Sequence, residues 1–196
     1  MKFIQIVFSL ILACIVNIQY SKALCSIEKN DKCNVFIQDT SKLPSLQIEQ
    51  QVLKTMTIIY IPDTVNMSGL NKVFESAYGE LFIFLTKNKI LPGKVMAFYH
   101  NYSDPIAVEA AVEVGNVPDA LTGRIKLRIV EGGNAVVVHY TGPYEEMETP
   151  YNALTKWLKD NHKKATGLPF EAYINDPSMV KDKYELKTDI YQLIKE

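Results

Sequence analysis

The sequence predicts an α+β domain in which a duplicated βαββ unit forms a six-stranded, mostly antiparallel sheet with two long helices on one face. Three observations lead to this prediction: two helical stripes of apolar residues, short runs of β-branched and aromatic residues around each helix, and matching residues about 73 positions apart. One unit alone leaves half of its apolar surface uncovered, so the two halves are expected to share a single sheet.

The first unit spans about residues 51–116. Its opening strand is predicted at residues 55–61, a run rich in Ile, Thr and Tyr that ends at a Pro-Asp turn. The helix that follows has an apolar stripe with helical spacing, made of Leu70, Val73, Phe74, Ala77, Tyr78, Leu81 and Leu85. Leu91-Pro92-Gly93 breaks the chain, and two further strands are expected at residues 95–99 and 106–114.

The second unit, about residues 123–196, repeats this order. A strand at residues 135–140 ends in a Thr-Gly-Pro turn, and the next helical stripe contains Met147, Tyr151, Leu154 and Leu158. Two more strands are expected at residues 170–174 and 184–193. The helices match at positions 73 apart, as in Tyr78 with Tyr151 and Phe84 with Trp157. We therefore predict an internal repeat.

Residues 1–23 have the pattern of a signal peptide. Lys2 precedes an almost wholly apolar stretch at residues 3–18, and Ser21-Lys22-Ala23 has small residues at both ends of a cleavage triplet. A membrane anchor and a lipoprotein signal at Cys14 are the alternatives. The apolar stretch is short for a span of about 20 residues, and the chain stays apolar after Cys14. We expect cleavage after Ala23 and export, either to a periplasm or out of the cell, with no membrane span left.

Residues 24–50 are polar and are interpreted as an N-terminal arm ahead of a domain at residues 51–196. Export leaves Cys25 and Cys33, and in an oxidising compartment this spacing closes a small loop. We predict a structural Cys25–Cys33 disulfide. The pair offers too few ligands for a metal site, and no His lies nearby.

The composition excludes several classes of function. The formal net charge of the 196 residues is −1, which gives no broad basic surface for nucleic acid. His100, His139 and His162 are scattered without the spacing of a zinc site. The sequence also has no phosphate loop and no nucleophile elbow. We expect no metal, no cofactor and no nucleic-acid partner.

Four segments carry a family resemblance: H-Y-T-G-P-Y-E at residues 139–145, Y-N-A-L-T-K-W-L at 151–158, and above all P-F-E-A-Y-I-N-D-P at 169–177 and Y-E-L-K-T-D-I-Y at 184–191. They resemble the GyrI-like small-molecule-binding family, which includes effector-binding domains of multidrug-responsive transcription regulators and DNA gyrase inhibitory proteins. The resemblance covers residues 52–194. It implies a duplicated βαββ fold and a pocket between the halves for an amphipathic, often cationic or aromatic molecule. With a signal peptide and no preceding helix-turn-helix segment, we do not expect a transcriptional role.

By motif match, the resemblance assigns the acidic pocket residue to Glu171, in the middle of a short strand. Strand alternation puts Tyr173 on the same face. The alternative is an edge-strand glutamate that faces water. A carboxylate in an apolar cleft would have a raised pKa and could attract a cation or move a proton. The other residues expected to line the cleft are Trp157, for which core packing is the alternative, and Tyr140, Tyr144, Met96 and Phe98.

We expect an exported protein that binds or sequesters an amphipathic aromatic or cationic compound. The alternative is a hydrolase of strained, cyclopropanoid rings, which a subset of the family resembles, with Glu171 as general acid or base. One carboxylate without a partner base is little support for catalysis. A third possibility is an interaction module that acts through its surface.

Overall fold

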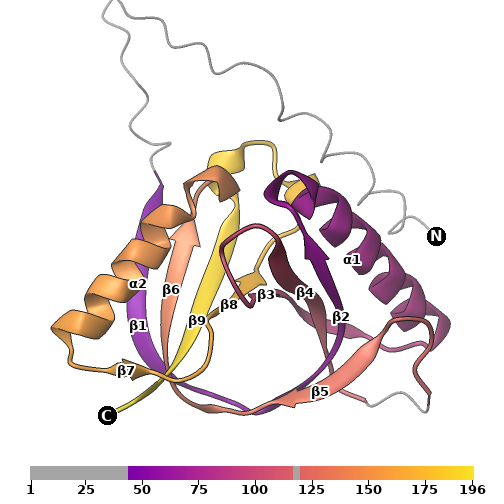
Figure 1. The fold of residues 1–196 in the computed structure, drawn as a ribbon, viewed down its shortest axis with the longest axis horizontal. Helices are drawn as coiled ribbons and strands as arrows, with labels where there is room; N and C mark the ends of the chain where they lie inside the picture. Colours follow the sequence, from indigo (N-terminus) through magenta and orange to yellow (C-terminus); the bar gives the residue numbers. More distant parts are fainter. Residues whose placement is uncertain (1–43, 117–119) are drawn as a thin grey trace, which may run out of the picture.

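The computed structural model describes residues 44–116 and 120–196. The predicted signal peptide, Cys25 and Cys33 therefore lie outside the described residues. Figure 1 shows the elements in chain order, and four short 3-10 helices, η2–η5, join them. The strands and helices are β1 (Ser45–Leu53), β2 (Met56–Val65), α1 (Leu70–Lys87), β3 (Pro92–Tyr99), β4 (Ile106–Val114), β5 (Lys126–Val130), β6 (Gly133–Thr141), α2 (Glu148–Asp160), β7 (Lys164–Ala165), β8 (Phe170–Tyr173) and β9 (Lys187–Lys195).

The strands pair antiparallel in the order β1-β6-β9-β8-β3-β4-β2-β5, and β7 pairs with β9. The α+β class with a large antiparallel sheet and two helices is confirmed. The predicted number of six strands is wrong, because the described residues form nine. The duplication of the unit stays a prediction.

The strands that the sequence analysis missed are β1, β5 and β7. β1 includes residues 45–50, which had been interpreted as part of the arm. Its Gln- and Glu-rich sequence has low intrinsic strand preference, and it becomes a strand by pairing with β6 along its whole length. β5 has only five residues and pairs with β2 in the same way, while β7 has two.

Both helices cover the same face of the sheet, as predicted. One row of paired residues crosses seven strands on this face: Ile61, Ala110, Ala97, Glu171, Ile190, Val138 and Ile48. α1 packs over the end of the row that contains Ile61 and Ala110. α2 packs over Val138 and Ile190. Since paired residues share a face, the row shows that α1 and α2 lie on one side, with Glu171 as the charged residue between apolar neighbours.

The two helices leave the centre of the sheet between them. α1 packs on β2 and β4, and α2 packs on β6, so the central strands β3 and β8 lie under neither helix. Figure 1 shows α2 at the left and α1 at the right, over the two ends of the strongly curved sheet. A side chain on the helix-covered face of β3 or β8 can therefore point into the space between α1 and α2.

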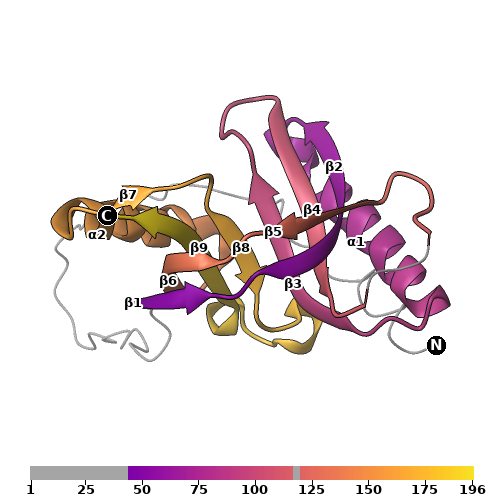
Figure 2. The same cartoon turned by 90° about the horizontal axis from the view of Figure 1, so that it is seen from below.

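The opposite face of the sheet encloses a third apolar core. Its centre is a stack of three rings, with centroids 5.0 Å apart between Phe98 and Phe170 and again 5.0 Å between Phe170 and Tyr191. The core is closed where the β1–β2 and β5–β6 connections meet (Figures 1 and 2). There the Gly132 amide donates to the Thr55 hydroxyl at 3.0 Å. Among the described residues, no helix has the length and apolarity needed to cross a membrane.

Candidate functional site

The candidate site is centred on Glu171 in β8, at the middle of the sheet. Its side chain is on the helix-covered face and is only 5% exposed, although carboxylates rarely lie so deep unless they are paired. On either side it has Ala97 of β3 and Ile190 of β9. The edge-strand alternative, with a glutamate facing water, is therefore excluded.

Two tyrosine hydroxyls hold the Glu171 carboxylate, one on each oxygen. Tyr151 of α2 donates to Oε1 at 2.9 Å, and Tyr173 of β8 donates to Oε2 at 2.9 Å. Hydrogen bonds to a charged acceptor are stronger than those between neutral groups, so the pair fixes the orientation of the carboxylate. Both donors are neutral, and they leave its negative charge uncompensated.

Further aromatic rings surround this carboxylate, and we call the six tyrosines among them the tyrosine cage: Tyr78, Tyr99, Tyr102, Tyr144, Tyr151 and Tyr173. Neighbouring rings are in contact, with centroids 6.1 Å apart for Tyr99 and Tyr102, 6.0 Å for Tyr102 and Tyr151, and 5.7 Å for Tyr144 and Tyr173. Phe74 of α1 extends the cluster by contacts with Tyr78 and Tyr99. The Tyr78 hydroxyl donates to the Met96 backbone oxygen at 2.7 Å. The cage is thus built by both helices, two central strands, a loop and a 3-10 helix.

Burial sets the charge state of the site. Desolvation raises the pKa of Glu171, and the hydrogen bonds from Tyr173 and Tyr151 offset part of this rise. Burial also raises the pKa of the cage tyrosines, with the nearby Glu171 charge as a further cause; the pKa of Tyr144 rises to about 12. All six phenols are therefore neutral hydrogen-bonding groups at physiological pH.

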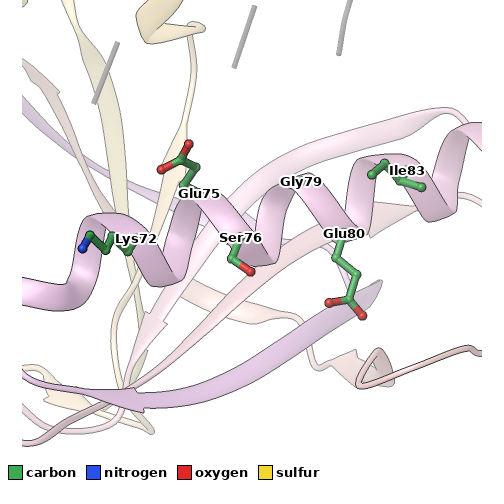
Figure 3. Close-up of a pocket in the computed structure, with 6 residues that line it drawn as sticks. All are labelled: Lys72, Glu75, Ser76, Gly79, Glu80 and Ile83. Carbon is green, nitrogen blue, oxygen red and sulfur yellow. The ribbon is translucent and has the colours of Figure 1, made fainter. Parts of the chain in front are cut away.

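The cage is closed over Glu171, and its outermost rings are Tyr102 and Tyr144. Tyr102 is 59% exposed and Tyr144 38% exposed. Two hollows lie elsewhere on the molecule. One, of about 460 Å³, follows a single side of α1, where Lys72, Ser76, Gly79 and Ile83 lie along the helix (Figure 3). The other, of about 270 Å³, lies beside the β1–β2 connection.

The structure brings together three of the seven predicted binding residues, namely Glu171, Tyr173 and Tyr144. Trp157 is half-buried in the core between α2 and the sheet, which was the alternative considered for it. Tyr140 is 2% exposed and donates to the Pro143 carbonyl at 3.3 Å, so it supports the turn after β6.

Met96 and Phe98 do not lie with Glu171. Strand pairing places Ala97 beside Glu171, so its neighbours on β3 point to the opposite face and belong to the enclosed third core. Both side chains were expected on the wall of the cleft, and the structure corrects this placement. Alternation correctly separates two sets of residues within β3, but it does not say which set meets Glu171.

Four cage tyrosines were missed as site residues: Tyr78, Tyr99, Tyr102 and Tyr151. Tyr78 and Tyr151 had been assigned to the apolar stripes of the two helices. A signal was present, because a tyrosine in a stripe that faces the sheet needs a partner for its hydroxyl; the acceptor is Glu171 for Tyr151 and the Met96 backbone oxygen for Tyr78. Tyr102, in the β3–β4 loop, carries no such signal.

No group of three or more His, Cys, Asp and Glu side chains is arranged to hold a metal ion in the part of the chain that the structure describes. The cage itself offers one carboxylate and neutral phenols. Aromatic faces with a single buried charge suit an organic cation better than a small inorganic one, which requires several oxygen ligands.

The fold and the site define a small-molecule-binding domain of the α+β class. The GyrI-like small molecule binding domain family matches residues 46–195. The chain therefore belongs to this family, in agreement with the resemblance seen in its motifs. No curated protein sequence matches the chain.

Solved structures share the fold at low sequence identity. The chain is similar to EcmrR in a cryo-EM structure of an EcmrR–DNA complex (TM-score 0.68, 20% identity, covering 77% of this chain and 58% of that one). It is also similar to the EcmrR C-terminal domain alone (0.63, 20%, 77% and 98%). A hydrolase from Listeria innocua (0.57, 14%, 76% and 92%) and SAV2435 bound to tetraphenylphosphonium (0.54, 12%, 76% and 94%) have the same fold. The chain therefore spans little more than half of the length of EcmrR. It covers nearly all of the separate EcmrR C-terminal domain.

Proposed function

We propose that the chain binds an amphipathic organic cation between α1 and α2, with Glu171 as the counter-charge and the tyrosine cage as the apolar contact surface. One observation carries this proposal: a carboxylate that is 5% exposed has two neutral hydroxyls as its hydrogen-bond donors, and no cationic side chain among the described residues is a cause of its pKa shift.

The energetics favour a cation over a neutral guest. When Glu171 is ionised, its buried charge without a partner costs several kcal/mol, and a cationic ligand removes that cost. Each ring face that the cation contacts adds about 0.5–2 kcal/mol. The rings also bury the apolar part of the ligand, at about 25 cal/mol per Å². A neutral molecule of the same shape gains only the last of these contributions.

Entry of the ligand involves the two exposed rings. Tyr102 contacts Tyr99 and Tyr151, while Tyr144 contacts Tyr173 edge to face. Ring contacts of this kind are worth about 0.5–1.5 kcal/mol each, so turning Tyr102 or Tyr144 outward costs little compared with the gains of binding. SAV2435, which has the same fold, is described as bound to tetraphenylphosphonium, and this supports the choice of that cation as a probe.

The test is calorimetric titration with tetraphenylphosphonium and with neutral triphenylphosphine oxide. We expect the cation to bind the protein and Glu171→Gln to weaken it by roughly 30-fold or more, the consequence of losing a buried charge pair worth at least ~2 kcal/mol. Binding of the neutral compound should change little. Glu75→Gln, which removes an equal charge from α1 on the hollow of Figure 3, is the matched control and should leave both affinities unchanged. Equal weakening of both compounds in Glu171→Gln would contradict the proposal.

Hydrolysis of a strained ring is the second candidate considered. A buried carboxyl group with a raised pKa is suited to donate a proton. Activating water for attack needs a base on the other side of the substrate, and the groups that contact the Glu171 oxygens are phenols with raised pKa values. Binding therefore has the stronger support. Turnover of a cyclopropane-containing electrophile that is lost in Glu171→Gln would reverse this preference.

We also propose that the protein acts after export, as a domain that sequesters or senses its ligand outside the cytoplasm. The support is the signal-peptide pattern of residues 1–23 and the two cysteines that follow it, Cys25 and Cys33.

A further inference from the structure

The hydroxyls of the tyrosine cage form a chain that passes through Glu171. The Tyr99 hydroxyl interacts with that of Tyr173, and Tyr173 in turn bonds the carboxylate. On the other side Tyr151 bonds the carboxylate, and its hydroxyl interacts with that of Tyr102, whose ring it meets edge to face with centroids 6.0 Å apart. This series of hydroxyl groups therefore extends from Tyr99 through Glu171 to Tyr102, and Tyr102 is 59% exposed.

A phenol is both a donor and an acceptor, so this chain can serve two charge states of Glu171 without moving its heavy atoms. When Glu171 is ionised, Tyr151 donates to Oε1. When Oε1 carries a proton, that O–H donates to Tyr151, Tyr151 donates to Tyr102, and Tyr102 donates to solvent. The reversed chain ends at an exposed hydroxyl, so no buried donor is left without an acceptor.

The groups that face Glu171 from every surrounding element are uncharged at physiological pH. They are Tyr78 from α1, Tyr99 from β3, Tyr102 from the β3–β4 loop, Tyr144 from η3, Tyr151 from α2 and Tyr173 from β8. On β9, Ile190 lies opposite Glu171, and Thr188 lies opposite Tyr173. Asp176, in the loop after β8, acts on Tyr144 and adds negative charge. Before a ligand binds, these neutral and negative neighbours therefore favour the protonated, neutral form of Glu171 over its carboxylate.

We propose that Glu171 carries a proton before ligand binding and that an organic cation displaces it, so the site exchanges one proton for one cation. This inference rests on the proposed function, and it adds the condition under which the site binds and releases its ligand. The balance of charge is complete: the O–H bond of Glu171 breaks, its electrons stay on the carboxylate, and the proton leaves along Tyr151 and Tyr102 to water. The buried site is neutral before the exchange and neutral after it, and it avoids the cost of an isolated buried charge in both states.

The direction of the pH dependence follows from the exchange. Burial raises the pKa of Glu171, so at pH values below the raised pKa the cation must displace a proton. Affinity for a permanent cation should therefore rise by about tenfold per pH unit in that range and become constant above it. A ligand that loses its own proton is unsuitable for this measurement. Tetraphenylphosphonium is suitable because its charge does not depend on pH.

The experiment is calorimetry of tetraphenylphosphonium binding at one pH in two buffers with different ionisation enthalpies. We expect up to one proton released per cation, with the full proton at acidic pH, and no release in Glu171→Gln. Tyr102→Phe removes the outlet of the chain, so the protonated acid loses its last acceptor and the pH midpoint should fall. Tyr60→Phe removes a hydroxyl at the third core, on the opposite face of the sheet from Glu171, and should keep the midpoint.

The possible results separate the two claims. If tetraphenylphosphonium binds without releasing a proton and its affinity does not depend on pH, the exchange is refuted and the proposed function stands. If it does not bind at any pH, the proposed function fails for this probe. Infrared difference spectra of ligand-free protein against Glu171→Gln then test the protonated acid directly. A protonated carboxyl band that is present in the wild type and absent in the variant supports it, and a carboxylate band alone across the acidic range overturns it.

Discussion

Replacing Glu171 by Gln should make the protein more stable at neutral pH, although it removes the residue on which binding depends. Gln has the same shape, and its amide oxygen and nitrogen can take over the bonds with Tyr151 and Tyr173, whose hydroxyls both donate and accept. What disappears is the desolvation of a carboxylate that is 5% exposed. Every unit by which burial raises the pKa of Glu171 corresponds to about 1.4 kcal/mol of folding free energy lost by the wild type above that pKa.

The pH dependence of this effect has a definite sign. Because the folded pKa lies above the unfolded one, the folded state holds the proton to higher pH, and folding is disfavoured once the proton is lost. The two proteins should have nearly equal stability below the ordinary glutamate pKa of about 4.3. The advantage of Glu171→Gln should then grow as pH rises and become constant above the raised pKa.

The measurement is urea unfolding of the wild type and Glu171→Gln at a series of pH values, with Glu75→Gln as the control for a change in net charge. The free energy of unfolding of the control should follow the wild type at every pH. A Glu171→Gln protein that is less stable than the wild type at neutral pH, or a difference that does not change with pH, would refute the reasoning. Either result would mean that the carboxylate is compensated in the folded protein.

Four further predictions concern other parts of the molecule. A side chain at Gly132 would meet backbone atoms, with Thr55 N at 2.6 Å, so Gly132→Ala should lose about 1–3 kcal/mol in urea unfolding. Gly79→Ala, on the open side of α1, meets nothing within 4 Å and should gain about 0.5–1 kcal/mol from helix propensity. Burial lowers the pKa of His139, but Asp189 at 2.7 Å and Glu49 at 3.3 Å outweigh it and raise the pKa. The contribution of these ion pairs to pairing of β6 with β9 and β1 should be full below the ordinary His pKa and be lost as pH rises through the raised one. An NMR titration in which Asp189→Asn fails to lower the His139 pKa would exclude this. In a secretory host, N-terminal sequencing should find Leu24 first, and mass spectrometry of the unreduced protein should find no free thiol at Cys25 and Cys33.

Local patterns were sufficient for the helices and for the central acid. The stripe that includes Leu81 and Leu85 predicted the buried face of α1, because helical spacing puts those side chains on one side whatever the neighbours are. Glu171 was found because a charge in a short apolar strand contradicts the pattern around it, and its family motif gave it a role. Local patterns failed for β1 and β5, whose strand conformation depends on pairing with β6 and β2.

The sequence by itself determined which residues alternate together along each strand and helix, since that follows from the backbone period alone. Only the tertiary structure decided which faces meet. The register between β3 and β8 puts Ala97 beside Glu171, and thereby sends Met96 and Phe98 to the other core. The packing of both helices on one face then brings Tyr78 and Tyr151, 73 positions apart, into one cage, where Tyr151 bonds Glu171 and Tyr78 bonds the Met96 backbone. Register and helix packing depend on contacts between distant segments, and no local pattern contains that information.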